Sequence, residues 1–324
     1  MSETPGVLIS GDITPHMRDK LGAAFTLHDL PPEAERAVFF ERIARDCIAG
    51  VAYGAAVFPK SFIDALPALE IISCYGVGYD AIDAETAAER GIVVTHTPNV
   101  LNDEVANTAI LLWLATARRL AAHDAYVRAG RWESEGNTPL TQGTQNQTVG
   151  IVGMGRIGQA IADRLPVFGA RIAYHGRTKR DVPYTYYPDL VEMARDCDVL
   201  IVITPGGPAT RHLINADVMD ALGPTGILVN VARGTVVDEP ALVSALQEGR
   251  LGAAGLDVFE NEPFVPEALR QMDQVVLQPH VGSATETTRR AMGDLTCDNL
   301  LAFIEDGTVL TPVPECAGFA KKRA

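Results

Sequence analysis

Short apolar runs alternate with helical patterns along the first third of the chain. Runs of β-branched and other apolar residues predict strands at 7–10, 49–53, 70–74 and 93–95. Helical patterns such as 33–47 lie between them. Strands that alternate with helices are typical of a parallel sheet with helices on both faces. The pattern therefore predicts an α/β fold.

The same alternation resumes after residue 147. Six further strands are predicted at 148–152, 170–175, 199–204, 226–231, 252–257 and 274–277. A long helical pattern from 103 to about 128 separates the two sets of strands, and we expect it to bridge two domains. A last helix is predicted at 286–305, and the tail 311–324 is too short for a domain of its own. Periodicity leaves open whether this tail returns to the first domain.

Length and charge fit an ordinary two-domain enzyme. The chain has 324 residues, more than one average domain and fewer than three. Acidic residues outnumber basic ones by 41 to 27, and no basic block precedes Lys321, Lys322 and Arg323. Phosphate binding needs concentrated positive charge, so we expect neither nucleic acid nor an anionic membrane as a partner.

The cysteines and the chain ends point to the cytoplasm. Five cysteines, widely spaced and never in a C-x-x-C pair, indicate neither a disulfide framework nor a metal site. Residues 1–6 show no signal segment, and the longest apolar stretch, 109–117, is too short to span a bilayer. We therefore expect no metal and a reducing compartment.

A glycine-rich turn follows the first strand of the second set. The segment T-V-G-I-V-G-M-G-R-I-G (148–158) places Gly153, Gly155 and Gly158 in G-x-G-x-x-G spacing between a strand and a helix. The first glycine permits the turn, the second lets a pyrophosphate approach the backbone, and the third allows close helix packing. In that context the motif predicts a dinucleotide site, and a purely structural turn is the lesser alternative.

The end of the next strand indicates which dinucleotide is bound. A site selective for NAD usually carries an acidic residue there, which binds the ribose hydroxyls. Residues 174–180 read Y-H-G-R-T-K-R and contain no carboxylate. Cations suit a 2'-phosphate, so we predict NADP(H) as the preferred cofactor with NAD(H) as the alternative. A solvated basic loop that tolerates both cofactors is the competing interpretation.

Polar residues follow three later strands of the second set. Arg233 comes after G-I-L-V-N-V-A, Asp257 closes G-A-A-G-L-D, and His280 follows Q-V-V-L-Q-P. An open α/β sheet binds its ligand at these carboxyl ends. Glu262 lies shortly after Asp257. A structural ion pair for Arg233 and a simple loop carboxylate for Glu262 are the alternatives.

Several separated motifs together resemble the D-isomer-specific 2-hydroxyacid dehydrogenases, most closely the glyoxylate/hydroxypyruvate reductases. They are the glycine-rich turn, G-V-G-Y-D (76–80), T-P-N-V-L-N-D-E-V-A (97–106), N-V-A-R-G-T-V-V-D (230–238), G-L-D-V-F-E-N-E-P (255–263) and P-H-V-G-S-A-T (279–285). The resemblance implies two Rossmann-like doubly wound domains, with a cofactor domain (99–287) inserted into a substrate domain (1–98 and 288–324). It also implies a homodimer.

The resemblance assigns roles to these residues. Arg233 would grip the carboxylate and keto oxygen of the substrate, His280 would be the general acid, and Glu262 would pair with it. The backbone N–H groups of Val77 and Gly78 would hold the substrate carboxylate. The chemistry agrees, because a reduced keto group needs a proton and imidazolium is the acid matched to neutral pH. A carboxylate beside His280 favours its protonated form.

Cofactor contacts are expected at the same strand ends. The glycine-rich turn and the strand ends give the set Gly153, Met154, Gly155, Arg156, Ile157, Gly158, His175, Gly176, Arg177, Thr178, Thr204, Pro205, Thr210, Val231, Ala232, Asp257 and Gly282.

The sequence thus predicts an NADPH-preferring reductase of small 2-keto acids, converting glyoxylate and hydroxypyruvate to glycolate and D-glycerate. A reductase of a larger 2-keto acid, of the D-lactate or aromatic type, is the main alternative, because one methylene changes discrimination by only about 1 to 3 kcal/mol. A nucleotide-sensing corepressor on the same scaffold is a more remote alternative.

Some positions depart from the family pattern or have no assigned role. Asn107 stands where relatives often carry an acidic residue, and T-P-G-G-P-A-T (204–210) replaces the commoner P-L-T-P-E-T. Tyr53 and Gly54 are candidates for shaping the substrate pocket. We expect a structural role for His96, His123, His175 and His212, although His175 also lies in the expected cofactor loop.

Overall fold

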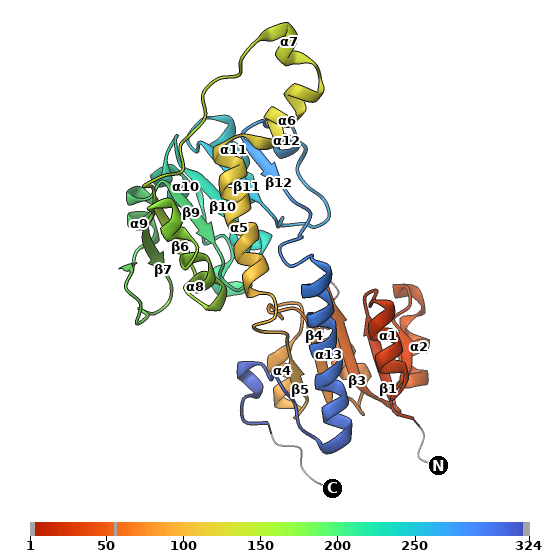
Figure 1. Cartoon of the computed structure of the whole chain (residues 1–324). Helices are drawn as coiled ribbons and strands as arrows, with labels where there is room; N and C mark the ends of the chain where they lie inside the picture. Colours follow the sequence, from red (N-terminus) through yellow and green to blue (C-terminus); the bar gives the residue numbers. More distant parts are fainter. Residues whose placement is uncertain (1–3, 55–56, 320–324) are drawn as a thin grey trace. The chain divides into compact units, whose positions relative to one another are not determined.

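The computed structural model describes residues 4–54 and 57–319. The chain divides into two compact units, Met1–Leu101 with Thr285–Ala324, and Asn102–Ala284 (Figure 1). The second unit is therefore inserted in sequence between the two segments of the first.

The first unit is built on a five-stranded parallel sheet in the order β2-β1-β3-β4-β5. Its strands are β1 (Gly6–Ser10), β2 (Thr26–Asp29), β3 (Cys47–Tyr53), β4 (Ile71–Tyr75) and β5 (Val93–Thr95). Its helices are α1 (Pro15–Gly22), η1 (Glu33–Glu35), α2 (Arg36–Ile43), α3 (Lys60–Ala65), α4 (Ala84–Glu89), α13 (Glu286–Asp306) and η5 (Pro314–Cys316). Every residue of β1, β4 and β5 is buried, which explains why these strands appear in the sequence as continuous apolar runs.

Two predictions for this unit were wrong. The helix expected at 33–47 ends at Ile43, and Cys47 already begins β3. The strand β2 was missed, because none of its four residues is buried and it therefore lacks an apolar run.

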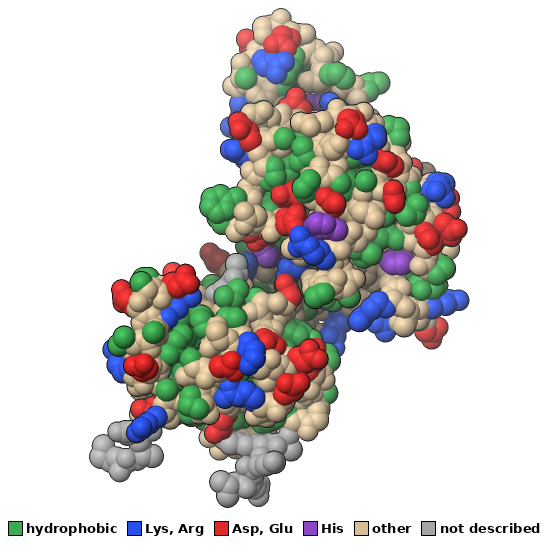
Figure 2. Space-filling view, turned by 180° about the vertical axis from the view of Figure 1, so that it is seen from behind, with side chains coloured by type: hydrophobic (Ala, Val, Ile, Leu, Met, Phe, Trp, Pro, Cys, Tyr) green, Lys and Arg blue, Asp and Glu red, His purple; other side chains and the backbone are tan. Residues whose placement is uncertain are grey.

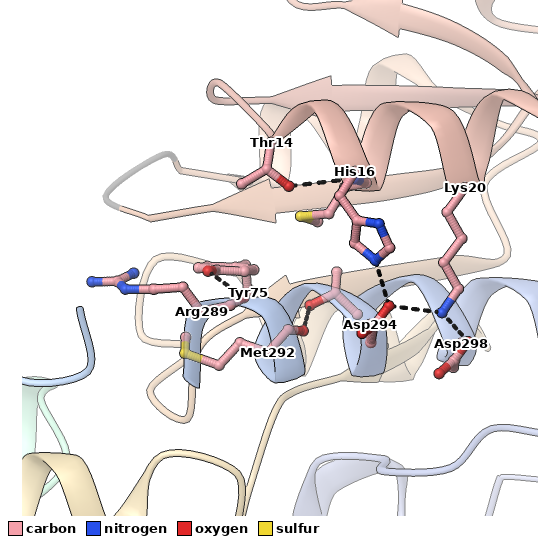
Figure 3. A network of polar contacts seen from close by, with 10 residues as sticks. Thr14, His16, Lys20, Tyr75, Arg289, Met292, Asp294 and Asp298 are labelled. Atoms are coloured by element: carbon pink, nitrogen blue, oxygen red, sulfur yellow. Dashed lines mark hydrogen bonds and ion pairs between the residues drawn. The ribbon is translucent and has the colours of Figure 1, made fainter. Parts of the chain in front are cut away.

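The last helix and the tail return to the first unit. Asp294 of α13 accepts a hydrogen bond from His16 Nε2 at 2.7 Å and forms an ion pair with Lys20, which also pairs with Asp298 (Figure 3). The hydrogen bond from His16 and the nearby Lys20 lower the pKa of Asp294 despite some burial. Farther along the tail, the Val313 N–H donates to the Val94 carbonyl of β5. These contacts answer the question that periodicity left open.

The second unit contains a seven-stranded parallel sheet in the order β12-β11-β10-β9-β6-β7-β8. Its strands are β6 (Thr148–Val152), β7 (Arg171–His175), β8 (Thr185–Tyr187), β9 (Val199–Val202), β10 (Ile227–Asn230), β11 (Ala253–Leu256) and β12 (Val275–Leu277). Its helices are α5 (Asn102–Ala117), α6 (Leu120–Arg128), α7 (Arg131–Glu135), α8 (Arg156–Ala162), η2 (Leu165–Phe168), α9 (Leu190–Asp196), η3 (Pro208–Thr210), α10 (Ala216–Leu222), η4 (Gly234–Val236), α11 (Glu239–Gln247) and α12 (Glu267–Arg270). The two parallel α/β sheets confirm the predicted fold class.

The strand order changes direction at β6: the strands that follow are added first on one side of β6 and then on the other. β6 pairs with β7 on one side and with β9 on the other. In an open α/β sheet, ligands bind outside the carboxyl ends of the strands at such a switch point. The glycine-rich turn begins at Gly153, directly after β6, so the fold puts it at that point.

All ten predicted strands are present within two residues of their expected bounds, but two further features were not predicted. The edge strand β8 is only three residues long and was missed. The helix expected from 103 to about 128 is two helices, because Arg119 adopts a left-handed conformation (φ 47°) between α5 and α6. Within the described residues, no helix combines the length and apolar character needed to cross a membrane.

Candidate active site

The turn after β10 presents Arg233. The buried side chain of Asn230 accepts a hydrogen bond from the Ala232 N–H and donates one to the Arg233 carbonyl, both at 3.0 Å. A Cβ on the next residue, Gly234, would lie 1.8 Å from the Phe259 carbonyl carbon. The backbone after Arg233 therefore packs directly on the segment that follows Asp257. Sequence reasoning did not identify this role of Asn230, because nothing in its local pattern signals it.

Asp257 holds the loop that carries His280. Its buried carboxylate accepts hydrogen bonds from the Val281 N–H at 2.7 Å and the Gly282 N–H at 2.9 Å, and its carbonyl accepts one from the His280 N–H. Burial raises the pKa of Asp257, and these two N–H groups and the charge of His280 offset only part of that effect. Both carboxylate oxygens thus bind this loop, and the cofactor contact expected for Asp257 stays a prediction.

His280 and Glu262 are hydrogen-bonded. Nδ1 of His280 lies 2.8 Å from Oε2 of Glu262, whose Oε1 accepts from the Phe259 N–H. His280 has φ 54°, an uncommon conformation for a residue with a side chain. Its side chain is 45% exposed, so the imidazole is accessible from solvent.

The electrostatics of Glu262 favour its ionised form. Burial alone would raise the pKa of Glu262, but the hydrogen bond and charge of His280, the Phe259 N–H and the nearby Arg233 guanidinium together lower it. A carboxylate that stays ionised stabilises a proton on the imidazole it contacts. The pair can therefore act as an oriented proton donor.

The glycine-rich turn leaves room for a ligand. Gly153 has φ 111°, and a Cβ on Gly158 would lie 2.1 Å from the Gly153 carbonyl oxygen, so both positions require glycine. A Cβ on Gly155 would meet no atom within 4 Å. Packing therefore does not require glycine at 155, and the backbone there is open to close approach of a ligand.

The other expected cofactor residues lie at neighbouring strand ends of the same sheet. His175 ends β7 and is followed by Gly176, Arg177 and Thr178, while Val231 and Ala232 follow β10. Pro205 and Thr210 belong to one loop after β9, which the Thr210 hydroxyl closes by donating to the Pro205 carbonyl at 2.7 Å. The buried Thr204 hydroxyl has no hydrogen-bond partner among the described residues, a property it shares with side-chain oxygens of Thr97, Thr116 and Gln278, and it lies where a cofactor could bind it. Met154 is buried, and Arg156 and Ile157 begin α8.

The two departures from the family pattern have structural explanations. Asn107 accepts a hydrogen bond from Arg164 Nε at 2.8 Å, and Asp103 pairs with the same guanidinium. Gly207 has φ 120°, a conformation that favours glycine, in the loop that Thr210 closes.

Val77 and Gly78 lie in the first unit, in the loop after β4. The Val77 carbonyl lies 2.9 Å from Nδ1 of His96, and the ring of Tyr79 packs edge-on against that imidazole. The Tyr79 hydroxyl donates to Glu315, and burial together with this carboxylate raises the pKa of Tyr79 to about 12. His96 therefore supports the loop expected to bind the substrate, which agrees with the structural role expected for it.

Tyr53 ends the neighbouring strand β3, and Gly54 follows it. The ring of Tyr53 stacks on Tyr75 with centroids 4.2 Å apart, and the Tyr75 hydroxyl donates to the Arg289 carbonyl of α13 (Figure 3). Both tyrosines thus lie at the carboxyl edge of the smaller sheet, beside the loop of Val77 and Gly78. Within the described ranges 4–54 and 57–319, no group of three or more His, Cys, Asp or Glu side chains is placed to hold a metal ion.

Comparison with known proteins places this site in a family. A family model described as "D-isomer specific 2-hydroxyacid dehydrogenase, NAD binding domain" matches residues 110–282. The chain belongs to the D-isomer specific 2-hydroxyacid dehydrogenases. The matched residues include Arg233, Glu262 and His280, whereas Val77 and Gly78 lie before the matched range.

Relatives of this dehydrogenase cover nearly its whole length. It is 46% identical to a hydroxyphenylpyruvate reductase of Plectranthus scutellarioides and to a glyoxylate/hydroxypyruvate reductase A of Arabidopsis thaliana, each over 96% of this chain and 99% of the relative. It is 47% identical to a crystal structure of an NADPH-dependent glyoxylate/hydroxypyruvate reductase from Sinorhizobium meliloti in complex with NADP and malonate. That similarity covers 99% of this chain and 100% of the other, with a TM-score of 0.91.

Proposed function

We propose that this dehydrogenase is an NADPH-preferring reductase of small 2-keto acids, converting glyoxylate and hydroxypyruvate to glycolate and D-glycerate. The observation that carries the proposal is the 2.8 Å hydrogen bond between His280 and Glu262. The positive charge of Arg233 also lowers the pKa of Glu262. The names of the Arabidopsis and Sinorhizobium relatives support this substrate class.

In this proposal His280 and Arg233 act on the keto group. When bound, NADPH supplies a hydride to the keto carbon. Protonated His280 donates a proton to the keto oxygen, and Glu262 keeps the imidazole oriented and charged. The Arg233 guanidinium binds the carboxylate and keto oxygen, for which its planar set of donors is suited. The Val77 and Gly78 N–H groups bind the substrate carboxylate.

The residues present fit NADP(H). The open space at Gly155 would admit the pyrophosphate, and the partnerless Thr204 hydroxyl lies after the next strand of the sheet. The loop after β7 offers Arg177 and Thr178 to a 2'-phosphate and has no carboxylate before Asp181. NAD(H) remains the alternative cofactor.

Steady-state turnover tests the proposal. Glyoxylate, hydroxypyruvate and pyruvate are assayed with NADPH and with NADH, and we expect the highest kcat/KM for glyoxylate or hydroxypyruvate with NADPH. A ratio that favours NADH contradicts the cofactor preference. Binding of the nucleotide without turnover of any keto acid would favour a nucleotide-sensing protein instead.

A second candidate is reduction of an aromatic 2-keto acid. It is favoured by the hydroxyphenylpyruvate reductase of Plectranthus, whose identity to this chain equals that of the Arabidopsis relative. Adding 4-hydroxyphenylpyruvate to the same panel separates the two candidates, because a larger side chain needs a larger pocket.

We also propose that the protein is a homodimer in the cytoplasm. α6 and α7 extend away from the seven-stranded sheet (Figure 1), and Leu120, Val127, Trp132 and Leu140 of this segment are at least 54% exposed. Figure 2 shows apolar side chains, in green, on its surface. Light scattering of the purified chain measures the oligomeric state.

The cysteines support the cytoplasmic location. All five are free and buried, which suits a reducing compartment.

Glu262→Gln should change the pH dependence of reduction. The amide cannot stabilise the imidazolium, so we expect the alkaline fall of kcat/KM to move to lower pH. The folded chain should also become less sensitive to acid, because the lowered pKa of Glu262 contributes stability that is lost as the pH falls through that pKa. Rate profiles and unfolding curves measured across pH test both effects. An unchanged rate profile argues against the pairing.

Gly155→Ala should separate folding from cofactor binding. The new methyl meets no protein atom, so we expect the thermal midpoint to be kept or slightly raised. The methyl occupies the space proposed for the pyrophosphate, so the Kd for NADPH should rise by more than about tenfold, or about 1.4 kcal/mol. Gly143→Ala is the matched control, since its Cβ also meets nothing within 4 Å. Unchanged NADPH binding in Gly155→Ala would contradict the site.

A further inference from the structure

Residues 175–180, which are the last residue of β7 and the first part of the connection to β8, are hydrogen-bonded to a buried tyrosine. The hydroxyl of Tyr174 accepts a hydrogen bond from the Arg180 N–H at 2.8 Å and donates one to the Arg180 carbonyl at 3.1 Å. Tyr174 is fully buried and is the last residue but one of β7. One hydroxyl thus bonds both the N–H and the carbonyl of Arg180, the last residue of this segment.

A second tyrosine supports the near end of the loop. The Tyr186 hydroxyl donates to the Gly176 carbonyl at 3.2 Å, and its ring lies against that of Tyr174 with centroids 5.2 Å apart. The two tyrosines are paired in register across β7 and β8. The His175 carbonyl accepts from the Gly153 N–H at 2.9 Å, which ties the same loop to the glycine-rich turn.

The backbone of this segment is hydrogen-bonded, but its basic side chains are not. Arg177, Lys179 and Arg180 are exposed, and among the described residues none of the three forms a side-chain hydrogen bond or ion pair. Five other arginines of the second unit, by contrast, do pair with carboxylates: Arg128, Arg131, Arg164, Arg211 and Arg250. Three neighbouring cations without acidic partners repel one another, so a backbone held by hydrogen bonds limits how far the repulsion can separate their side chains.

We propose that Tyr174 is a positioning residue that sets the selectivity for a 2'-phosphate over a 2'-hydroxyl. Its hydroxyl holds the backbone of residues 175–180, so that Arg177, Thr178 and Arg180 converge on a dianionic group. This inference rests on the proposed cofactor preference. The ligand class that it concerns is an adenosine nucleotide carrying a 2'-phosphate, and Tyr174 acts on it only through the loop.

Tyr174→Phe isolates this role, because Phe keeps the buried ring and removes only the hydroxyl. The probes are adenosine 2',5'-bisphosphate and 5'-AMP, which differ by the 2'-phosphate alone, with Kd measured by calorimetry. We expect the preference for the bisphosphate to fall roughly five- to tenfold, as for the loss of about one hydrogen bond to each backbone group. The Kd for 5'-AMP should stay unchanged, and the ratio of kcat/KM for NADPH and NADH should fall in parallel.

Tyr187→Phe is the matched control. Tyr187 also lies on β8, but its hydroxyl donates to Asp196 at 2.8 Å and not to the loop. This variant should keep the wild-type preference. Tyr186→Phe should lower the preference as well, and it provides the same test if Tyr174→Phe does not fold.

The outcomes distinguish failure of the Tyr174 role from failure of the NADP preference. An unchanged preference in Tyr174→Phe, or in Tyr186→Phe when Tyr174→Phe does not fold, overturns the positioning role, as does an equal loss for both nucleotides or the same loss in Tyr187→Phe. A wild-type chain that binds both nucleotides equally removes the proposed NADP preference, and the positioning role falls with it.

Discussion

Replacing His280 by Ala is expected to lower kcat for reduction by about 100-fold or more, the usual contribution of a positioned proton donor. His280 is hydrogen-bonded to Glu262, and its backbone is held by the Asp257 carbonyl, so its imidazole is oriented before any substrate binds. The KM for NADPH should change little. Stopped-flow and steady-state rates of NADPH oxidation measure the effect.

The positive φ of His280 calls for a second variant. Ala is strained at φ 54°, so His280→Ala could shift the loop as well as remove the acid. Asn tolerates this conformation better and donates no proton of comparable acidity, so His280→Asn should lose as much activity with less structural change. His123→Ala on α6 is the control. A kcat near the wild-type value in both His280 variants would exclude His280 as the acid.

Replacing Arg233 by Lys is expected to lower kcat/KM for the keto acid roughly 30- to 100-fold, or about 2 to 3 kcal/mol, the range for a charged hydrogen bond. Lys keeps the positive charge that helps to lower the pKa of Glu262 but lacks the planar pair of donors. The loss therefore reports the geometry of the guanidinium and not a change in the His280–Glu262 pair. The pH profile should keep its shape.

Asn230 supports the turn in this variant as well. Its side chain bonds the Ala232 N–H and the Arg233 carbonyl, and these two contacts remain when the Arg233 guanidinium, which also donates to the Ala232 carbonyl at 2.8 Å, is replaced. Arg211→Lys is the control, because Arg211 is an exposed arginine of the same unit that pairs with Glu260. An unchanged KM and kcat for glyoxylate in Arg233→Lys would contradict the proposed clamp.

Strands with buried residues were predicted correctly from the sequence, and strands without buried residues were missed. Strands such as β4 and β9 are buried on both faces, so their residues must be apolar and their positions were predicted to within two residues. β2 and β8 have no buried residue and carry no such constraint, so both were missed. The break at Arg119 was missed because its left-handed conformation has no glycine or proline to mark it.

The sequence by itself determined the α/β class, the position of the glycine-rich turn and the residue types available for catalysis. It could do so because a strand, a tight turn and a helix depend on neighbours in the chain. Only the tertiary structure decided how Asp257 holds the loop of His280, how His96 supports Val77, and how Tyr174 fixes residues 175–180. Each of those contacts joins a side chain to the backbone of another segment or loop, and the folding of the sheets is what brings them within hydrogen-bond distance.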